Sequence, residues 1–155
     1  MITTYIPNIT LLAEQTILAY VSQSLSGSNL IDPATQWYAG VGNGDIEGPA
    51  VLVTCNTAEE VVFQSRVYRL NCDVSTRMMA YDSSTSSNYT NSAISLGGNV
   101  CSLFGSTDLT VPGINTLRTG LAAIQVQVKN FANERTDDSW ISNCNFDLVA
   151  TLVNN

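Results

Sequence analysis

The sequence predicts an α+β fold in which a single antiparallel β-sheet, with mixed pairing also allowed, carries two α-helices packed on one face. Three observations predict this fold. Apolar residues recur with helical spacing over residues 7–25. Apolar and polar residues alternate over residues 68–75, which is typical of a strand with one buried face. Two longer alternating runs near the end of the chain are separated by a polar link, and they predict an antiparallel hairpin.

The length of 155 residues is that of one ordinary domain. A chain of this size buries roughly two thirds of the surface that its unfolded form exposes, so one hydrophobic core is sufficient. The sequence contains no internal repeat and no linker, so we expect residues 1–155 to form a single domain.

The first expected element is a helix over residues 7–25. Pro7 suits the first turn of a helix, and Gly27 suits its end. The apolar stripe comprises Ile9, Leu12, Ala13, Ile17, Tyr20 and Val21. Three leucines are expected on the opposite side, namely Leu11, Leu18 and Leu25.

The outer face of this helix is poor in charge. Glu14 is the only charged residue of the helix, whereas a solvated surface helix normally carries several. We therefore expect the face that holds Gln15 and Ser22 to contact a neighbouring protein.

Residues 26–49 have the composition of a loop, with five glycines and two prolines. A short strand is expected within this segment at residues 36–41, where Trp37 and Tyr38 are candidate contact residues. The apolar run at residues 50–55 lies between a proline and an asparagine, and it predicts a buried strand.

A longer strand is expected over residues 62–75, and its second half alternates clearly. The side chains predicted to point into the core are Tyr68, Leu70, Cys72 and Val74. Those predicted to point the other way are Arg69, Asn71, Asp73 and Ser75. This strand should therefore have one buried side and one polar side.

A second helix is expected over residues 86–104, weakened by the pair Gly97-Gly98. Residues 109–120 should form a connector in which Pro112-Gly113 marks a turn. Neither segment offers a candidate functional residue.

The closing hairpin is the clearest pattern in the chain. In its first strand the predicted core side chains are Ile124, Val126 and Val128, and in its second strand they are Trp140, Cys144, Phe146, Leu148 and Ala150. Residues 133–139 should form the polar turn between them. Four residues of this turn are candidate assembly contacts, namely Glu134, Arg135, Asp137 and Asp138.

Charged residues make up only 12% of the chain, about half the usual share. A surface so poor in charge favours a protein that buries much of its outside against neighbours. The alternative is a monomer kept in solution by its many serines, threonines and asparagines.

The net charge of −7 leaves six cationic residues among thirteen acids. Binding to a phosphate backbone or to an anionic membrane normally requires a basic patch, so we expect no specific nucleic acid and no membrane among the partners. The first residues lack the pattern of a signal peptide, and no run is long enough to cross a membrane. We therefore expect the chain to stay in the cytoplasm.

The sequence offers little for catalysis or metal binding. Histidine, the commonest general base and metal ligand, is absent. The four cysteines (Cys55, Cys72, Cys101 and Cys144) are widely spaced and are expected to be buried free thiols. On a strand, Arg69 and Cys72 point to opposite faces, so no activated cysteine is expected. The glycine-rich residues 40–44 are followed by a strand, which does not fit a dinucleotide site. We expect no enzyme, no cofactor and no metal.

The order of the expected elements resembles that of a known family. A short helix opens after TTYIPNI, strands are expected in GPAVLVTCNTAEEV and SRVYRLNCDVSTR, and a polar helix follows. The hairpin IQVQVKNFANERTDDSWISNCNFDLVATL closes the chain. This order is similar to that of the small tail-terminator or neck proteins of tailed bacteriophages. The resemblance covers most of the chain, and residues 26–48 match it least.

The resemblance implies a structural virion protein that closes the growing end of a tail tube as a homo-oligomeric ring, commonly a hexamer. Its implied partners are further copies of the chain, the tail tube protein and the head–tail connector or adaptor. Its implied location is the virion tail or neck, after assembly in the host cytoplasm. The polar loops at residues 26–48 and 133–139 are then the candidate contacts with the tube or the connector.

Two alternatives remain. The chain can instead be another head–tail adaptor, a tail-completion protein or a tube subunit, which only its position in the particle would distinguish. From a different class, it can be a small cytoplasmic ligand-binding domain that uses the loop with Trp37 and Tyr38 as a lid.

Overall fold

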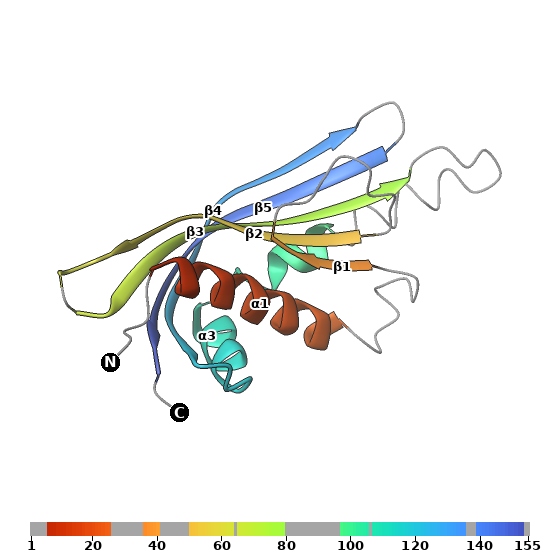
Figure 1. Ribbon diagram of the computed structural model, residues 1–155. Helices are drawn as coiled ribbons and strands as arrows, with labels where there is room; N and C mark the ends of the chain where they lie inside the picture. The colour runs from red at the N-terminus through yellow and green to blue at the C-terminus, as the bar shows by residue number, and fades with distance from the viewer. Residues whose placement is uncertain are drawn as a thin grey trace.

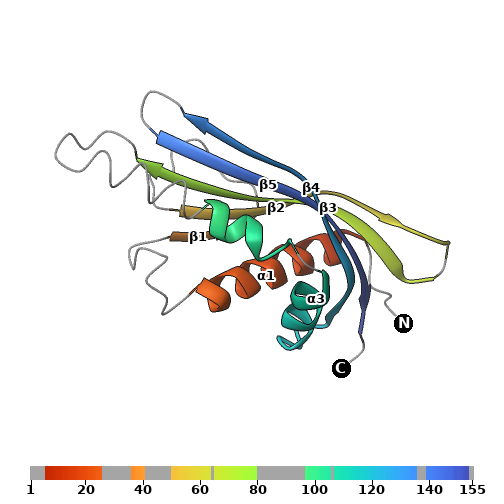
Figure 2. The same ribbon diagram turned by 180° about the vertical axis from the view of Figure 1, so that it is seen from behind.

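The computed structural model describes residues 6–25, 36–40, 50–63, 65–79, 97–105, 107–135 and 139–153. They form helix α1 (Ile6–Leu25), strands β1 (Gln36–Ala39), β2 (Ala50–Glu60) and β3 (Val67–Met79), helix α3 (Thr107–Asn115), and strands β4 (Leu121–Arg135) and β5 (Ser139–Leu152). A short helical segment, residues 97–102, precedes α3. Figures 1 and 2 show one long, twisted sheet with the helices on the same side of it.

The sheet is mixed, with the strand order β1-β2-β3-β5-β4. β1 runs parallel to β2, and the other neighbouring strands are antiparallel. β2 and β3 form one hairpin, β4 and β5 form another, and the pairing of β3 with β5 joins the two. The α+β class is confirmed, in the mixed form that the pattern allowed.

Helix α1 packs on the sheet through an inclined row of residues at four-residue spacing. This row comprises Ile9, Ala13, Ile17, Val21 and Leu25, all of them buried. Leu25 was expected on the opposite side of the helix, and that was wrong, because the row drifts around the helix and ends at its last turn. Leu11 is 52% exposed, as expected, and Leu12 and Leu18 pack at the margin of the core.

Three aromatic rings fill the centre of the core. Phe104 stacks on Phe146 of β5 with ring centroids 4.3 Å apart, and Tyr20 meets Phe104 edge-on at 5.8 Å. The Tyr20 hydroxyl donates a hydrogen bond to the carbonyl oxygen of Leu103 at 3.3 Å. These contacts join α1, the region after the helical segment 97–102, and the sheet.

The hairpin of β2 and β3 is longer than the sequence predicted. β2 continues to Glu60, although its second half is polar, and β3 begins only at Val67. Val62 and Phe63, and then Ser65 and Arg66, were expected to start the second strand, but they lie outside it, in the turn. Figure 1 shows the end of this hairpin projecting beyond the helices. In the second half of β2 only Ala58 packs against the core, so the apolar run that marks the first half of the strand is lost.

Helix α3 replaces the expected connector and includes Pro112 and Gly113. The predicted turn at this pair was therefore wrong. Gly113 is required for close packing, since a Cβ atom there would lie 2.6 Å from Cε1 of Tyr20. After α3, the side-chain amide of Asn115 accepts a hydrogen bond from the backbone N–H of Ala123 at 2.7 Å and donates one to its carbonyl at 3.1 Å.

Of the second expected helix, residues 97–102 are helical, and residues 86–96 lie outside the described part of the chain. Gly97 lies directly against β5, where a Cβ atom would come within 2.2 Å of the Ser142 hydroxyl oxygen. The glycine pair that weakens the helical pattern in the sequence thus permits this contact with the sheet.

The closing hairpin forms as predicted, with two differences in β4: it continues through Asn133–Arg135, which were expected in the turn, and it carries two bulges. The register with β5 shifts between Ala123 and Gln125 and again between Val128 and Asn130. The first bulge leaves Ile124 without a cross-strand partner and 49% exposed, so the expectation that it faces the core was wrong. In β5 the inward side chains from Cys144 to Ala150 are buried as expected.

Candidate assembly surfaces

The most exposed apolar surface in the described chain is the turn of the β2–β3 hairpin, which we call the arm tip (Val61, Val62 and Phe63). These side chains are 45%, 63% and 85% exposed, respectively. Keeping a phenylalanine in water forgoes about 1.5–3 kcal/mol relative to burial. A contiguous apolar patch of this kind is typical of a contact site for another molecule.

The arm tip is held by hydrogen bonds. The N–H of Val61 donates to the carbonyl of Val67 at 2.8 Å. The N–H of Arg66 donates to the Glu60 carboxylate at 2.9 Å, and its carbonyl accepts from the Thr151 hydroxyl at 2.9 Å. Arg66 adopts a positive φ of 60° to close the turn. Hydrogen bonds therefore hold the described residues on both sides of the apolar side chains, which lowers the entropy lost on docking.

Sequence reasoning missed the arm tip because the run Val61-Val62-Phe63 matched the start of a strand. The available signal was the position of this run directly after Glu59-Glu60 and before Gln64-Ser65-Arg66. An apolar triplet between charged and polar neighbours, with no alternation on either side, is typical of a loop tip as much as of a strand.

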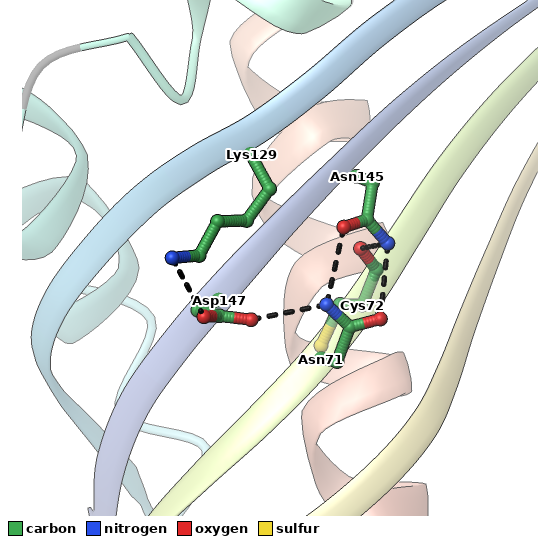
Figure 3. Close-up of polar contacts among 5 residues, drawn as sticks. All are labelled: Asn71, Cys72, Lys129, Asn145 and Asp147. Atoms are coloured by element: carbon green, nitrogen blue, oxygen red, sulfur yellow. Dashed lines mark hydrogen bonds and ion pairs between the residues drawn. The ribbon is translucent and has the colours of Figure 1, made fainter.

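The second surface is the helix-free side of the sheet, where β3 and β5 carry interlocked amides and carboxylates (Figure 3). Asn71 and Asn145 form a reciprocal pair: each side-chain N–H donates to the other residue's carbonyl oxygen, at 3.1 and 3.0 Å. Asn71 also donates to Asp147 at 3.0 Å, and Asp147 lies 3.5 Å from the ammonium of Lys129 on β4. The network therefore crosses three strands.

Asp73 extends this network towards the neighbouring strands. One of its carboxylate oxygens accepts from Asn145 at 2.8 Å and from Asn143 at 3.0 Å, and the other accepts from Asn56 of β2. Amide donors, rather than cations, thus satisfy this carboxylate. The result is a polar face on which the asparagine and aspartate side chains are held by one another.

Charge on the helix-free face nearly balances. Strand pairing places four carboxylates and three cations of the described residues on this side, a difference of one: Glu59, Asp73, Glu134 and Asp147 against Arg69, Arg77 and Lys129. A shallow hollow there is lined by residues of β2, β3 and β5, including Leu52, Arg77 and Ile141. The face lacks the basic surplus that phosphate binding requires.

The two edge strands of the described sheet are β1 and β4. β1 has four residues, and β4 carries two bulges together with the exposed Lys129. Short edges, bulges and lysines all oppose strand addition by another chain. Side-chain contacts are therefore a better means of association for this molecule than an extended sheet.

The predicted contact residues do not form one surface. Gln15 is exposed on α1, whereas Ser22 is half-buried and already makes an interaction within the chain. Trp37 packs against the hydrophobic core, while the exposed Tyr38 donates a hydrogen bond to the Gln36 side chain at 2.6 Å. A packed Trp37 does not suit the lid of a ligand site.

The remaining predicted residues were expected in the turn of the closing hairpin, but Glu134 and Arg135 belong to β4. Glu134 is exposed and pairs with Ile141, which places it on the helix-free face. Arg135 is the last residue of β4, and nothing is described of its side chain; Asp137 and Asp138 lie outside the described residues. Tyr38 and Glu134 are therefore separated by three strands.

Two kinds of feature are absent from the part of the chain that the structure describes. No group of three or more His, Cys, Asp or Glu side chains in the described ranges is placed to hold a metal ion. Within the same ranges, no helix combines the length and apolar character needed to span a bilayer.

Comparisons with known proteins show likeness of fold but none of sequence. No protein-family model matches the chain, and no curated protein matches it in sequence. Among solved structures, the chain is similar to one from the virion of a native gene transfer agent (GTA) particle, with a TM-score of 0.53 and 14% sequence identity. The match covers 96% of this chain and 99% of that one, so the two share their fold over nearly their whole lengths.

Proposed function

We propose that this chain is a structural subunit of a phage-like virion, specifically a tail terminator or neck protein. In this role it forms a homo-oligomeric ring, commonly a hexamer, that caps the tail tube and joins it to the head connector. Its place is the tail or neck of the virion, after assembly in the host cytoplasm. The fold shared with a chain of a gene transfer agent virion supports a virion role.

The observation that carries the proposal is the ordered arm tip. The hairpin projects beyond the helices, and Phe63 at its end is 85% exposed. In an isolated subunit this apolar turn stays exposed to water and adds no stability, whereas a neighbouring subunit can bury it. Contact between two different surfaces of identical subunits is the geometry that closes into a ring.

The helix-free face also suits this role. Its charges nearly balance, and its carboxylates are engaged by amides and Lys129. A channel wall made of such faces would let a polyanion pass without holding it, because affinity for DNA depends on displaced counterions at Lys and Arg. We propose that this face lines the lumen of the ring.

The alternative functions fall into two classes, other virion proteins and a ligand-binding domain. A head–tail adaptor, a tail-completion protein or a tube subunit would use the same arm, and only its position in the particle separates them. A small ligand-binding domain is less well supported, because Trp37 packs into the core and the hollow near Arg77 is shallow. We propose no catalytic activity.

The test is the assembly state of the purified chain, measured by size-exclusion chromatography with light scattering and by electron microscopy of tail tubes. We expect a single large oligomer in solution or rings on tube ends. Phe63→Ser should weaken self-association at least about tenfold, because burial of this side chain contributes about 1.5–3 kcal/mol. Ile124→Ser, at a 49% exposed apolar residue away from the arm, is the matched control and should assemble normally.

A wild-type chain that stays monomeric and leaves tube length unchanged would refute the role. Equal assembly of wild type and Phe63→Ser would instead refute the arm tip as the contact.

A further inference from the structure

The four cysteines lie as two close pairs on the helix side of the sheet. The sulfur atoms of Cys55 and Cys72 are 3.0 Å apart, and those of Cys101 and Cys144 are 3.4 Å apart. All four are free thiols. In each pair one member is buried and the other is partly exposed: Cys72 and Cys144 are buried, while Cys55 and Cys101 are within reach of solvent. The prediction of buried free thiols therefore holds for two of the four.

The backbone already places the first pair for a covalent bond. Cys55 of β2 is directly opposite Cys72 of β3 in the antiparallel ladder. Residues paired in this way have Cα atoms about 4.5–5.5 Å apart, which lies inside the range that a disulfide tolerates. The pairing of β1 with β2 ends at Ala39 and Val53, so the Cys55 N–H has no strand partner on that side. The Glu14 carboxylate of α1 accepts this N–H at 3.1 Å and helps to hold Cys55 in place.

The second pair is held by packing on both sides. Cys101 belongs to the helical segment 97–102, and Cys144 lies on the inward face of β5. Gly97 rests against Ser142 at one end of the segment, and Phe104 stacks on Phe146 beyond its other end. The two sulfur atoms are thus kept close by contacts that do not involve them.

We propose that both pairs are disulfide-forming sites, so that two equivalents of a low-molecular-weight disulfide such as glutathione disulfide convert the chain with four thiols into one with two bridges. The thiolate of Cys55 or Cys101 attacks a sulfur of the oxidant, forms a mixed disulfide and releases one reduced thiol. The buried partner then loses its proton and attacks the cysteine sulfur of the mixed disulfide, releasing the second thiol. Two protein thiols are oxidised and one disulfide is reduced, so electrons and protons balance.

The bridges would secure two places where the fold depends on packing. The first joins β2 to β3 at the base of the arm, across a sequence separation of 17 residues. The second fastens the segment 97–102 to the middle of the sheet, across 43 residues. The chemistry does not depend on the proposed function. Only the time at which the bridges form depends on that function, because a virion subunit made in a reducing cytoplasm meets oxidising conditions after release.

Burial of the second thiol sets the rate. The hydrogen bond with Cys55, followed by burial, raises the pKa of Cys72 well above its usual value, and the neighbouring carboxyl groups of Asp73 and Glu14 act in the same direction. Burial, followed by the hydrogen bond with Cys101, raises the pKa of Cys144, again with a contribution from Asp73. The hydrogen bonds with Cys55 and Cys101 are lost once those sulfurs form the mixed disulfide, but burial still disfavours the thiolate of the resolving cysteine. That thiolate is therefore scarce at pH 7, and formation of the protein disulfide should accelerate as the pH rises, by up to about tenfold per pH unit.

The test uses the full chain, reduced and then incubated with glutathione disulfide at pH 7 and pH 8. Alkylation of residual thiols, followed by intact-mass measurement and peptide mapping, should show the loss of two hydrogen atoms per bridge and the pairs 55–72 and 101–144. The melting temperature should rise by roughly 6–12 °C per bridge and return to its starting value on reduction.

Matched variants separate the two sites. Cys55→Ser should keep only the 101–144 bridge, and Cys101→Ser only the 55–72 bridge, each with part of the thermal gain. Four alkylatable thiols after oxidation, glutathione adducts that persist at Cys55 and Cys101, or other pairings in the wild type would each overturn the proposal. The oligomeric state measured in the same samples tests the proposed function separately, since the bridges lie within one chain.

Discussion

At some positions of this molecule, the distance between two backbone segments determines whether a side chain fits. Gly97 and Gly98 are neighbours in the same helical segment, yet their surroundings differ. A Cβ atom on Gly97 would lie 2.2 and 2.3 Å from the Ser142 side chain, whereas one on Gly98 would meet nothing within 4 Å. The sequence shows two equivalent glycines, but only the first is demanded by packing.

Gly97→Ala should therefore destabilise the protein by about 1–3 kcal/mol, because the segment must move away from β5 to admit the methyl group. Gly98→Ala is the control and should be neutral or stabilising by up to about 1 kcal/mol through better helix propensity. Urea unfolding followed by circular dichroism measures both. Equal stability of the two variants would show that the contact between Gly97 and Ser142 is not tight.

Glu14 illustrates what cannot be predicted at the residue scale. It is the only charged residue of the helical pattern, and its charge suggests an exposed position. The structure buries it, with its carboxylate on the N–H of Cys55 at 3.1 Å. That N–H lies on the β1 side of β2, beyond the last pair of the β1–β2 ladder, Ala39 and Val53. The sequence does not show where β1 ends, so it does not show that this N–H needs an acceptor.

Among the elements, the pairing of β3 with β5 carries most of the polar network. Asn71 and Asn145 bond to each other and to the carboxylates of Asp147 and Asp73, respectively. Removing one partner of such a network leaves the others with unmet hydrogen bonds, while replacing both by apolar groups of similar shape can be nearly neutral.

Asn145→Val alone should cost about 1–3 kcal/mol, because both Asn71 and Asp73 lose a partner. Adding Asn71→Val should recover part of that loss, so the two changes should be non-additive in urea unfolding. The doubly substituted chain should also aggregate more readily, since its helix-free face then carries an apolar stripe. Strict additivity would mean that the network contributes no cooperativity.

Elements with a regular period were the predictable ones. The spacing of apolar residues predicts helix α1, the polar side of β3 and the inward side of β5, because these three elements pack on the core along their length. The second half of β2 and the helix α3 did not, for two physical reasons. The second half of β2 contributes only Ala58 to the core, so no apolar run marks it. Pro112-Gly113 occurs in a helix, where Gly113 accommodates Tyr20.

The candidate site was predicted less well than the fold. The low charge of the sequence predicts association, yet the pattern predicts a strand at the arm tip, which offers the best contact. Trp37 is a predicted contact residue, but it packs against the core. Contact surfaces carry no periodic pattern, so the sequence indicated that the chain associates without indicating where.

At the scale of the whole molecule, association should rest on apolar contact and neutral hydrogen bonds rather than on charge. We therefore predict that the oligomer measured by light scattering changes its dissociation constant by less than about threefold between 0.1 and 1 M NaCl, since screening acts on exposed charges. Phe63→Ser should weaken it at every salt concentration. A steep loss of the oligomer with salt would indicate that ionic contacts hold the ring.

The strand order also decides how the chain can reach its native state. β2 with β3, and β4 with β5, are hairpins of neighbouring segments, whereas β3 with β5 joins residues such as Tyr68 and Ala150 that are far apart in sequence. Closing that long loop costs entropy before any contact repays it, so the union of the two hairpins should limit the folding rate. Until β3 pairs with β5, the polar edges of both strands can pair with other chains. High expression should therefore favour intermolecular pairing at these two edges.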